Sequence, residues 1–285
     1  MDVRQAVETA VSPPSPVSDI LPLSGGCIGQ VYRVRLEDGR RLVAKADDSH
    51  NTRLDIEGDM LRYLAQRSQL PVPTVWYSSP QLLLMDFLAC DSHFSPGAQQ
   101  HAAELLAALH SVTAAQYGLE QDTLIGGLHQ PNPATDAWLD FFRRHRLLYM
   151  GRVAVESGRL PADVWHRVQR FADTIDRWLL EPERPSLLHG DVWTTNVLAQ
   201  GSQITGFLDP AIYYGHPEIE LAFTTLFGTF GRPFFDHYQT LRPLTAGFFE
   251  ERRDIYNLYP LLVHVRLFGG SYVGSVERIL TRFGY

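Results

Sequence analysis

Apolar and polar positions alternate with a period of two in the N-terminal part of the chain, which predicts half-buried strands. Residues 31–36 and 41–46 show this alternation, and the turn Glu37-Asp38-Gly39-Arg40 between them predicts a hairpin. The apolar run from Leu82 to Leu88 predicts a further, buried strand. Residues 52–66, between these strands, are predicted to be a helix. The pattern therefore predicts an antiparallel sheet with one main helix.

Beyond residue 88 the apolar spacing changes to the three-to-four-residue repeat of helices. The predicted helices include residues 96–112, 138–155, 161–180 and 218–227. The segment from Gly126 to Pro133 is predicted to be a loop. We therefore expect an α+β fold with two lobes: a small N-lobe over residues 1–88, which holds the antiparallel sheet, and a larger, mostly helical C-lobe over residues 89–285.

One stretch departs from the helical pattern and carries a cluster of polar groups. It reads His189-Gly190-Asp191-Val192-Trp193-Thr194-Thr195-Asn196, and a predicted hairpin over residues 197–208 then leads to Asp209. Kinase-type phosphoryl transfer needs these groups: one carboxylate takes the proton of the acceptor hydroxyl, and an amide with a second carboxylate holds Mg²⁺. Asp191 is therefore the predicted catalytic base, Asn196 and Asp209 are the predicted Mg²⁺ ligands, and ATP is the predicted donor. The expected two-lobed fold is accordingly protein-kinase-like.

The ATP-binding groups are expected in the N-lobe. Leu42-Val43-Ala44-Lys45 resembles the strand that carries the phosphate-binding lysine of kinases. Lys45 is predicted to contact the α- and β-phosphates, with Glu57 on the following helix as its partner. The alternative for Lys45 is a solvent-facing position on an edge strand, and the alternative for Glu57 is to be one of several surface acids. The kinase pattern as a whole favours the pair.

A glycine-rich turn is the second predicted nucleotide contact. Gly25, Gly26, Cys27 and Ile28 form a turn in which backbone N–H groups can approach phosphates without a Cβ in the way. The turn matches neither a P-loop nor a full G-x-G-x-x-G. Taken alone, it is therefore better explained as an ordinary hairpin turn, and its phosphate-binding role depends on the kinase pattern around it.

The strand from Leu82 to Leu88 is expected to end at the hinge between the lobes. Backbone groups of Asp86 and Leu88 are predicted to bond the edge of adenine, with Met85 behind them. A plain core strand that ends in a loop is the alternative.

Composition and charge exclude several classes of partner. The 285 residues are 45% hydrophobic and carry a formal net charge of −7, which argues against nucleic acid or an anionic membrane as the main partner. No apolar run is long enough to span a bilayer, and we expect no signal peptide because the N-terminus lacks a basic region followed by an apolar one. Cys27 and Cys90 have no zinc-site spacing, which fits reduced thiols in a cytoplasmic protein.

The sequence around the predicted active site resembles the fructosamine (ketosamine) 3-kinase family, which belongs with the aminoglycoside-phosphotransferase-like kinases of the protein-kinase-like superfamily. The string Asp209-Pro210-Ala211-Ile212-Tyr213-Tyr214-Gly215-His216 carries this resemblance more specifically than the general kinase groups do. The likeness runs in order along practically the whole chain. It includes Gly25-Gly26-Cys27-Ile28, Tyr117-Gly118-Leu119, Gln130-Pro131-Asn132, Leu226-Phe227-Gly228 and Leu267-Phe268-Gly269-Gly270-Ser271-Tyr272.

This resemblance implies an ATP-dependent kinase that phosphorylates the 3-hydroxyl of ketosamines, the fructosamine or ribulosamine adducts that form when a sugar glycates an amine. It also implies a deglycation repair activity, because the 3-phosphorylated adducts break down. The partners would be small ketosamines or glycated proteins. Trp193 and His216 are the predicted substrate contacts; for Trp193, a ring against the sugar and a ring in the core are equal alternatives. The family also suggests redox control through Cys27, with a packing role as the alternative.

Other interpretations stay open at this stage. Where the family commonly has Leu-Trp-Ser-Gly, this chain has Val192-Trp193-Thr194-Thr195, and Thr195 adds a branched side chain beside the metal site. An aminoglycoside-, choline- or homoserine-type small-molecule kinase is the first alternative, and a catalytically inactive nucleotide-binding scaffold is the second. The short segment after Asp209 argues against a protein kinase, because it leaves no room for a long activation loop. Both a monomer and a dimer fit the sequence.

Overall fold

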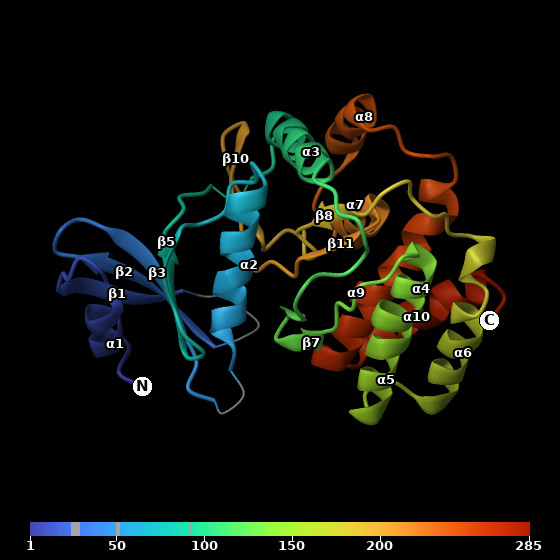
Figure 1. Cartoon of the computed structure of the whole chain (residues 1–285), viewed down its shortest axis with the longest axis horizontal. Helices are drawn as coiled ribbons and strands as arrows, with labels where there is room; N and C mark the ends of the chain where they lie inside the picture. Colours follow the sequence, from blue (N-terminus) through green and yellow to red (C-terminus); the bar gives the residue numbers. More distant parts are fainter. Residues whose placement is uncertain (24–28, 50–51, 92) are drawn as a thin grey trace.

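The computed structural model describes residues 1–23, 29–49, 52–91 and 93–285. Within these ranges the chain forms an antiparallel sheet with two helices beside it, followed by a larger, mostly helical part (Figure 1). The turn predicted to cover the phosphates, with Gly25, Gly26, Cys27 and Ile28, lies outside the described residues.

The N-terminal sheet has five strands in the order β1-β2-β3-β5-β4, and every neighbouring pair is antiparallel. Its strands are β1 (Val17–Leu23), β2 (Gln30–Leu36), β3 (Arg41–Ala46), β4 (Val75–Ser78) and β5 (Leu82–Asp86). The predicted hairpin is confirmed as β2–β3, and its turn contains Gly39 at φ +90°. The predicted strand at residues 82–88 is confirmed but ends at Asp86.

Alternation along the strands divides the side chains between the two faces of the sheet. On one face, Leu84 packs in a cluster with α1 (Val3–Ala10). On the other face, Leu83 packs with α2 (Leu54–Arg67), which is the predicted main helix. Lys45 of β3 is paired with Leu83 of β5, and paired residues point to the same face. The sheet therefore presents Lys45 to α2.

The remaining chain is mostly helical and encloses a large hydrophobic cluster to which α2 also contributes. Its helices are α3 (Pro96–Leu109), α4 (Trp138–Phe142), η1 (Arg143–Leu148), α5 (Tyr149–Glu156), α6 (Ala162–Ala172), η2 (Ile175–Arg177), α7 (Pro217–Leu226), α8 (Arg232–Leu241), η3 (Phe248–Arg252), α9 (Arg253–Phe268) and α10 (Ser271–Arg282). Its strands are β6 (Thr123–Ile125), β7 (Leu128–Gln130), β8 (Ser186–Leu188), β9 (Val197–Gln200), β10 (Gln203–Phe207) and β11 (Tyr213–Gly215).

Helix α2 lies between the N-terminal sheet and the helical part (Figure 1). Its Tyr63 donates a hydrogen bond of 3.2 Å to the hydroxyl of Tyr214 on β11. The strand-rich N-terminal part and the helical remainder agree with the predicted α+β class, while a boundary at residue 88 stays a prediction. None of the helices in the described ranges is both long and apolar enough to cross a lipid bilayer.

The prediction of a loop from Gly126 to Pro133 is partly wrong, because Gly126 and Gly127 form the turn of a hairpin and the next three residues form its second strand. Strand β6 pairs with β7 through the turn Gly126-Gly127, whose φ angles are +51° and +75°. Both central residues of such a turn need positive φ, which glycine adopts without strain. The sequence pattern missed these strands because three residues are too few to show an alternation.

The long aromatic helix predicted at residues 138–155 is present but is not α-helical throughout. Between α4 and α5 the segment η1 is a π-helix. A π-helical turn takes up an extra residue and shifts the side chains after it around the helix axis. One result is that Arg146 is fully buried, which a regular helical pattern does not predict.

The helix predicted at residues 161–180 ends earlier in the structure than its apolar spacing predicts. Helix α6 ends at Ala172, and Thr174 leaves the helical region with φ −128°. Beyond it the 3₁₀ turn η2 covers only Ile175–Arg177, and Trp178, Leu179 and Leu180 are not helical. Helical spacing therefore continues here without a continuous α-helical backbone.

A buried ion pair joins α7 to the segment before α9. Arg252 Nε and Nη2 each lie 2.7 Å from one carboxylate oxygen of Glu218, and both side chains are buried. Arg252 also donates to the carbonyl oxygens of Thr245 and Ala246, at 2.8 Å each. Two hydrogen bonds join the guanidinium of Arg252 to the carboxylate of Glu218. Each buried charge is therefore balanced by the other.

Replacement of Arg252 by Met should lower the free energy of unfolding by about 3–5 kcal/mol, because Glu218 would stay buried without its partner. Urea unfolding followed by circular dichroism measures the change. The matched control is Arg232→Met, which removes an exposed ion pair with Asp236 on α8 and should cost less than about 1 kcal/mol. Equal losses in the two variants would contradict the role given to the buried pair.

Candidate active site

Two loops that follow paired strands hold the polar groups of the site. Strand β8 leads into the loop with Asp191 and Asn196, and β10 leads into the loop with Asp209. Both strands have antiparallel partners, β11 for β8 and β9 for β10. The N–H of Leu208 donates a 2.8 Å hydrogen bond to the carbonyl oxygen of Asn196. The ends of the two loops are therefore fixed to each other next to Asp209.

Lys45 joins the N-terminal sheet to the loop after β10. Its Nζ lies 2.7 Å from Oε1 of Glu57 on α2, and it also contacts Oδ1 of Asp209. The Lys45–Glu57 pair predicted from the sequence is confirmed. Burial alone would lower the pKa of Lys45, but the charges of Asp209 and Glu57 outweigh it and raise that pKa. Burial, with the charge of Asp209, raises the pKa of Glu57.

Asp191 and Asn196 are bound to each other across the loop. Asn196 Nδ2 donates to the Asp191 carboxylate at 2.8 Å and to the Asp191 carbonyl oxygen at 3.0 Å. The Asn196 N–H donates to the carbonyl oxygen of Trp193 at 2.9 Å, so the loop closes on itself. Burial raises the pKa of Asp191 to about 8, and the negative charge of Asp209 acts in the same direction. Two carboxylates that repel each other in a buried site favour a cation beside them.

The oxygens of Asn196 and Asp209 fit a magnesium ion. Because Asn196 Nδ2 is bound to Asp191, its Oδ1 faces the other way, toward the hydroxyl of Thr195 at 3.3 Å. Mg²⁺ prefers oxygen ligands and is usually held by one or two protein groups together with phosphates and water. The described ranges contain no cluster of three or more His, Cys, Asp or Glu side chains that could hold a metal ion. Asn196 and Asp209 would therefore supply only part of the ligands that a magnesium ion needs.

The peptide group of Ala211 holds the two loops together. Its N–H donates a 2.7 Å hydrogen bond to the carbonyl oxygen of His189. Gly190 has φ +86°, and a Cβ at this position would lie 2.0 Å from the carbonyl oxygen of Ala211, so only glycine fits. Asp209, two residues before Ala211, has φ +52°, which costs a non-glycine residue about 1–2 kcal/mol. The contacts of Ala211 therefore hold a strained segment against the loop of Asp191.

A buried acid supports the loop from α7. The N–H of Gly190 donates a 2.6 Å hydrogen bond to Oε1 of Glu220. The other carboxylate oxygen of Glu220 lies 2.9 Å from Nε2 of His110, whose Nδ1 lies 2.7 Å from the hydroxyl of Tyr238. All three side chains are buried. This series of bonds fixes the peptide immediately before Asp191, and the sequence analysis did not single out Glu220.

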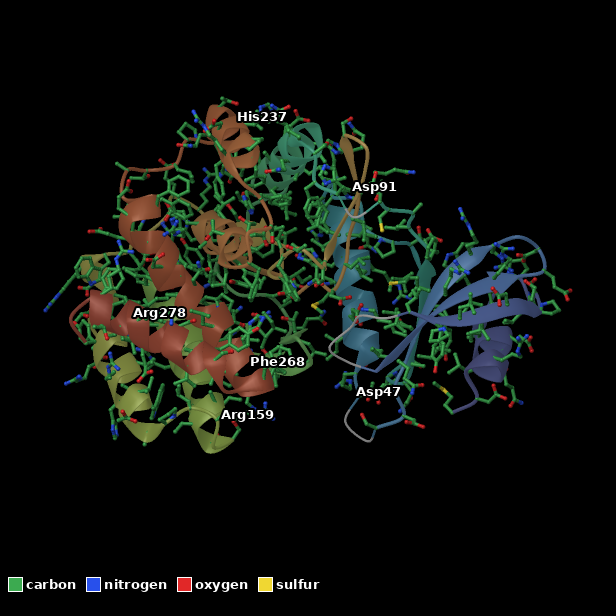
Figure 2. The ribbon with its side chains drawn as sticks, turned by 180° about the vertical axis from the view of Figure 1, so that it is seen from behind. Asp47, Asp91, Arg159, His237, Phe268 and Arg278 are labelled. Atoms are coloured by element: carbon green, nitrogen blue, oxygen red, sulfur yellow. The ribbon has the colours of Figure 1, made fainter. Side chains whose placement is uncertain are left out.

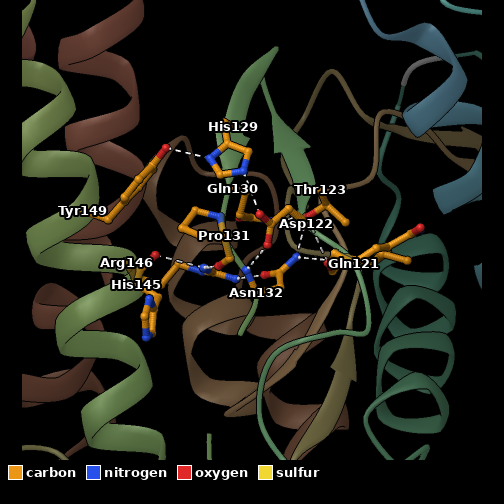
Figure 3. A network of polar contacts seen from close by, with 11 residues as sticks. Gln121, Asp122, Thr123, His129, Gln130, Pro131, Asn132, His145, Arg146 and Tyr149 are labelled. Carbon is orange, nitrogen blue, oxygen red and sulfur yellow. Dashed lines mark hydrogen bonds and ion pairs between the residues drawn. The ribbon is translucent and has the colours of Figure 1, made fainter. Parts of the chain in front are cut away.

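Gln130, at the end of the β6–β7 hairpin, supports the loop of Asp209. Figure 3 shows Gln130 among the polar groups of this hairpin. Its Nε2 donates to the carbonyl oxygen of Ala211 at 3.0 Å and to the hydroxyl of Thr123 at 2.8 Å. Its Oε1 accepts a 2.6 Å hydrogen bond from the hydroxyl of Tyr259 on α9. The Gln130 side chain is buried and has three partners from three segments, so its position is fixed. The sequence analysis noted Gln130 only as part of the family resemblance.

Arg146 in turn fixes the residues that follow Gln130. Its Nη1 donates to the carbonyl oxygen of Pro131 at 2.8 Å, and its Nη2 donates to Oδ1 of Asn132 at 2.7 Å (Figure 3). The guanidinium carbon lies 3.9 Å from the centre of the Tyr213 ring, on β11. A cation over an aromatic face is stabilised in the interior without a carboxylate. The hairpin and the strand after Asp209 are thus bound to one side chain.

The predicted hinge residues lie at the end of β5. Met85 is buried in the cluster between the sheet and α2. The N–H of Asp86 donates to the carbonyl oxygen of Thr74, so it is not available for adenine. Leu88 packs closely on β10, since a Cβ on Gly206 would lie 2.3 Å from Leu88 Cδ1. Adenine contacts of the Asp86 carbonyl and of Leu88 stay a prediction.

The two predicted substrate residues, Trp193 and His216, lie in different surroundings. Trp193 is half-buried in the Asp191 loop, and its ring centre lies 5.2 Å from that of Phe227. The ring of Trp193 packs on Phe227 and is partly exposed, so both a contact with the sugar and a role in the core fit this position.

His216 does not join the Asp191 cluster but caps α7. Its Nδ1 accepts a 3.1 Å hydrogen bond from the N–H of Glu218, and its ring packs against Trp138 and Tyr256. Burial lowers the pKa of His216 to about 3, and the positive charge of Arg252 acts in the same direction. These contacts give His216 a structural role.

Comparisons with known proteins agree with this fold. A family model described as fructosamine kinase matches residues 1–283. The probable ketoamine kinase of Enterococcus faecium is 32% identical and covers 97% of this chain and 99% of its own length. A crystal structure from Thermobifida fusca, of a protein provisionally named fructosamine-3-kinase, has a TM-score of 0.85 and 30% identity, with 99% of each chain covered. An aminoglycoside phosphotransferase in complex with ADP and hygromycin B shares the fold, with a TM-score of 0.71, 17% identity and 100% of each chain covered.

The fold is that of the protein-kinase-like phosphotransferases, as predicted. Within this class, the chain belongs to the fructosamine kinase family and is an ATP-dependent kinase. The family resemblance noted in the sequence is thereby confirmed.

Replacement of Gln130 by Leu should lower the kcat of the kinase about tenfold, because the Ala211 carbonyl loses its donor and the strained loop of Asp209 loses a support. The matched control is Tyr259→Phe, which removes a different hydrogen bond of Gln130 and keeps the bond to Ala211. Both variants should lose about 1–3 kcal/mol of unfolding free energy, measured in urea. Similar kcat values in the two variants would contradict the role of Gln130.

Acidification should destabilise the protein through His216. Because its pKa in the folded state is about 3, below the ordinary 6.5, the unfolded chain binds the proton first as the pH falls through 6.5. The resulting loss of unfolding free energy between pH 7 and pH 5 is about 1–2 kcal/mol. His216→Asn keeps a capping oxygen but does not titrate. Between pH 7 and pH 5 this variant should therefore lose about 1–2 kcal/mol less unfolding free energy than the unmodified protein. Urea unfolding at both pH values measures the difference, and equal losses would rule out this contribution.

Proposed function

We propose that this kinase transfers the γ-phosphoryl group of ATP to the 3-hydroxyl of ketosamines, on fructosamine or ribulosamine adducts. The observation that carries the proposal is the group formed by Lys45, Asp209, Asn196 and Asp191: a phosphate-binding ammonium, two oxygen ligands and a carboxylate base on adjoining segments. The family membership supports a ketoamine as the acceptor. Both the 3-position and the repair role are part of the proposal.

On the donor side, Lys45 binds the α- and β-phosphates and Glu57 orients it. Because Lys45 contacts Asp209 in the structure, an incoming phosphate replaces one of its two carboxylate partners. The phosphate contact predicted for Gly25, Gly26, Cys27 and Ile28 falls outside the described residues and stays a prediction from the sequence. Adenine lies against Met85 and bonds the carbonyl oxygen of Asp86 and the backbone of Leu88, since the Asp86 N–H is already bound to Thr74.

Asn196 and Asp209 would hold Mg²⁺ through their side-chain oxygens, and the ion would supply positive charge to neutralise the charge that develops during transfer. The hydrogen bonds of Asn196 Nδ2 to Asp191 and of Ala211 to His189 fix the proposed base and the proposed metal ligands relative to each other. Such preorganisation lowers the cost of bringing the acceptor hydroxyl to the γ-phosphate.

On the acceptor side, Asp191 orients the sugar hydroxyl and accepts its proton, an effect worth roughly 10²–10⁴ in rate. Trp193, on the same loop, presents its ring to the C–H face of the sugar. Phosphate at the 3-position, next to the keto group, is a better leaving group than hydroxide. The phosphorylated adduct then breaks down and releases the amine, which amounts to deglycation. We place this reaction in the cytoplasm, where ATP is available.

The test is a screen of ATP consumption with fructoselysine and ribuloselysine against aminoglycosides and choline. We expect turnover with the ketosamines, and phosphorus NMR of the product should show the phosphate on the 3-oxygen. Asp191→Asn should lower kcat by roughly 10²–10⁴. Asp236→Asn, an exposed acid on α8, is the matched control and should change kcat less than twofold. Transfer to none of the sugar amines, or to another hydroxyl, would refute the proposal.

A further inference from the structure

Two successive threonines in the loop after β8 depart from the common family pattern. The N–H of Asn196 donates to the carbonyl oxygen of Trp193 at 2.9 Å, so Thr194 and Thr195 occupy the two central positions of a turn. Among the described residues, Asp209 is the only non-glycine residue with a positive φ. The turn therefore needs no glycine at the position of Thr195, and a β-branched side chain fits its backbone.

The hydroxyl groups of the two threonines have different partners. Thr194 Oγ1 lies 3.2 Å from the hydroxyl of Thr229, a buried residue in the segment after α7. Thr195 Oγ1 lies 3.3 Å from Oδ1 of Asn196 and donates to it. Thr194 thus binds the loop to its surroundings, whereas Thr195 is directed at the oxygen that is the proposed cation ligand.

Hydrogen-bonding capacity remains at both oxygens of this contact. Asn196 Nδ2 uses its two N–H groups on the carboxylate and the carbonyl oxygen of Asp191, at 2.8 Å and 3.0 Å. A hydroxyl has one proton and two lone pairs, and the proton of Thr195 goes to Asn196 Oδ1. Within the described ranges the lone pairs of Thr195 have no partner. Rotation of this hydroxyl turns a lone pair toward a cation that binds at Asn196 Oδ1.

The distance between the two oxygens suits neighbouring ligands of one ion. Mg²⁺ holds its ligands in an octahedron at about 2.0–2.1 Å, which places neighbouring oxygens about 3 Å apart. Thr195 Oγ1 and Asn196 Oδ1 are 3.3 Å apart in the structure. Thr195 is also exposed, so its oxygen can be reached without displacement of the loop.

A neutral oxygen is the kind of ligand that the charges of this site favour. The negative charges of Asp191 and Asp209 already repel each other here, and a further carboxylate would add to the repulsion. In the part of the chain that the structure describes, no group of three or more His, Cys, Asp or Glu side chains is placed to hold a metal ion. A hydroxyl adds an oxygen ligand without adding charge.

We propose that the Thr195 hydroxyl is a third protein oxygen of the cation site, beside Asn196 Oδ1 and an oxygen of Asp209. This inference rests on the cation-binding role that the proposed function gives to Asn196 and Asp209, and it adds a ligand to the same site. Thr195 binds through an oxygen lone pair once its proton has turned away from Asn196. The side chain that departs from the family pattern is thus part of the site.

The test measures how strongly a divalent cation tightens nucleotide binding. Isothermal titration calorimetry gives the Kd of AMP-PNP, a non-hydrolysable ATP analogue, first in EDTA and then with saturating Mn²⁺, which also accepts oxygen ligands. The ratio of the two Kd values is the contribution of the cation and needs no acceptor. Thr195→Val keeps the shape of the side chain but not its hydroxyl. It should lower this ratio about tenfold, as loss of a group around a bound metal does, and leave the Kd in EDTA unchanged.

Further variants separate the oxygen from the bulk of the side chain. Thr195→Ser keeps the hydroxyl and should keep the ratio within about twofold, whereas Thr195→Gly should lose the same factor as Thr195→Val. One matched control is Thr194→Val, which removes the neighbouring hydroxyl. The other is Thr240→Val on α8, which removes an exposed hydroxyl bound to the carbonyl oxygen of His237. Figure 2 shows His237 at the outer surface of the helical part. Both controls should keep the ratio within about twofold.

Two results would overturn the inference and leave the proposed function intact. One is an unchanged ratio in Thr195→Val, and the other is an equal loss in Thr195→Val and in the two controls. A ratio near one in the unmodified protein, or a ratio that Asn196→Ala does not change, would be a different result. It would refute the cation site of the proposed function and the inference together. Thermal unfolding checks that each variant is folded.

Discussion

The arrangement of this protein depends on one buried ammonium group between two carboxylates. Lys45 comes from the N-terminal sheet, Glu57 from α2 and Asp209 from the loop after β10, so three separate elements meet at one positive charge. A buried lysine without partners tends to lose its proton, and a buried carboxylate tends to gain one. The two carboxylates keep Lys45 charged in the interior, and Lys45 in turn favours the charged form of Glu57. The contact therefore sets where the sheet and α2 lie relative to the helical part.

The helical part has a second centre of organisation, the peptide group of Ala211. The Asp191 loop reaches it through His189 and Gly190, and the β6–β7 hairpin reaches it through Gln130. Glu220 holds the Asp191 loop from α7 in the same way. The side chains of Gln130 and Glu220 are buried and hydrogen-bonded, so they are costly to disturb and hold a definite geometry. Asp191, Asn196 and Asp209 lie on the loops that these side chains hold.

Features with a local signal could be predicted from the sequence. The β2–β3 hairpin follows from alternation and Gly39, and the Lys45–Glu57 pair follows from motif spacing. Gln130 and Glu220 could not be found in this way, because their burial results from the packing of segments that are distant in sequence. Pro217 at the first position of α7 marks a helix start in the sequence, so a capping position for His216 could be predicted from it. The substrate contact of His216 stays a prediction.

The close contact of Gly190 with Ala211 has a consequence for motion. Because no space separates the two loops, the segments that carry Asp191, Asn196 and Asp209 are restrained from moving apart. In the proposed reaction, a triphosphate that reaches Lys45 would have to break its contact with Asp209 and would supply the negative charge that Lys45 loses. The nucleotide would thus take the place of an internal counter-ion.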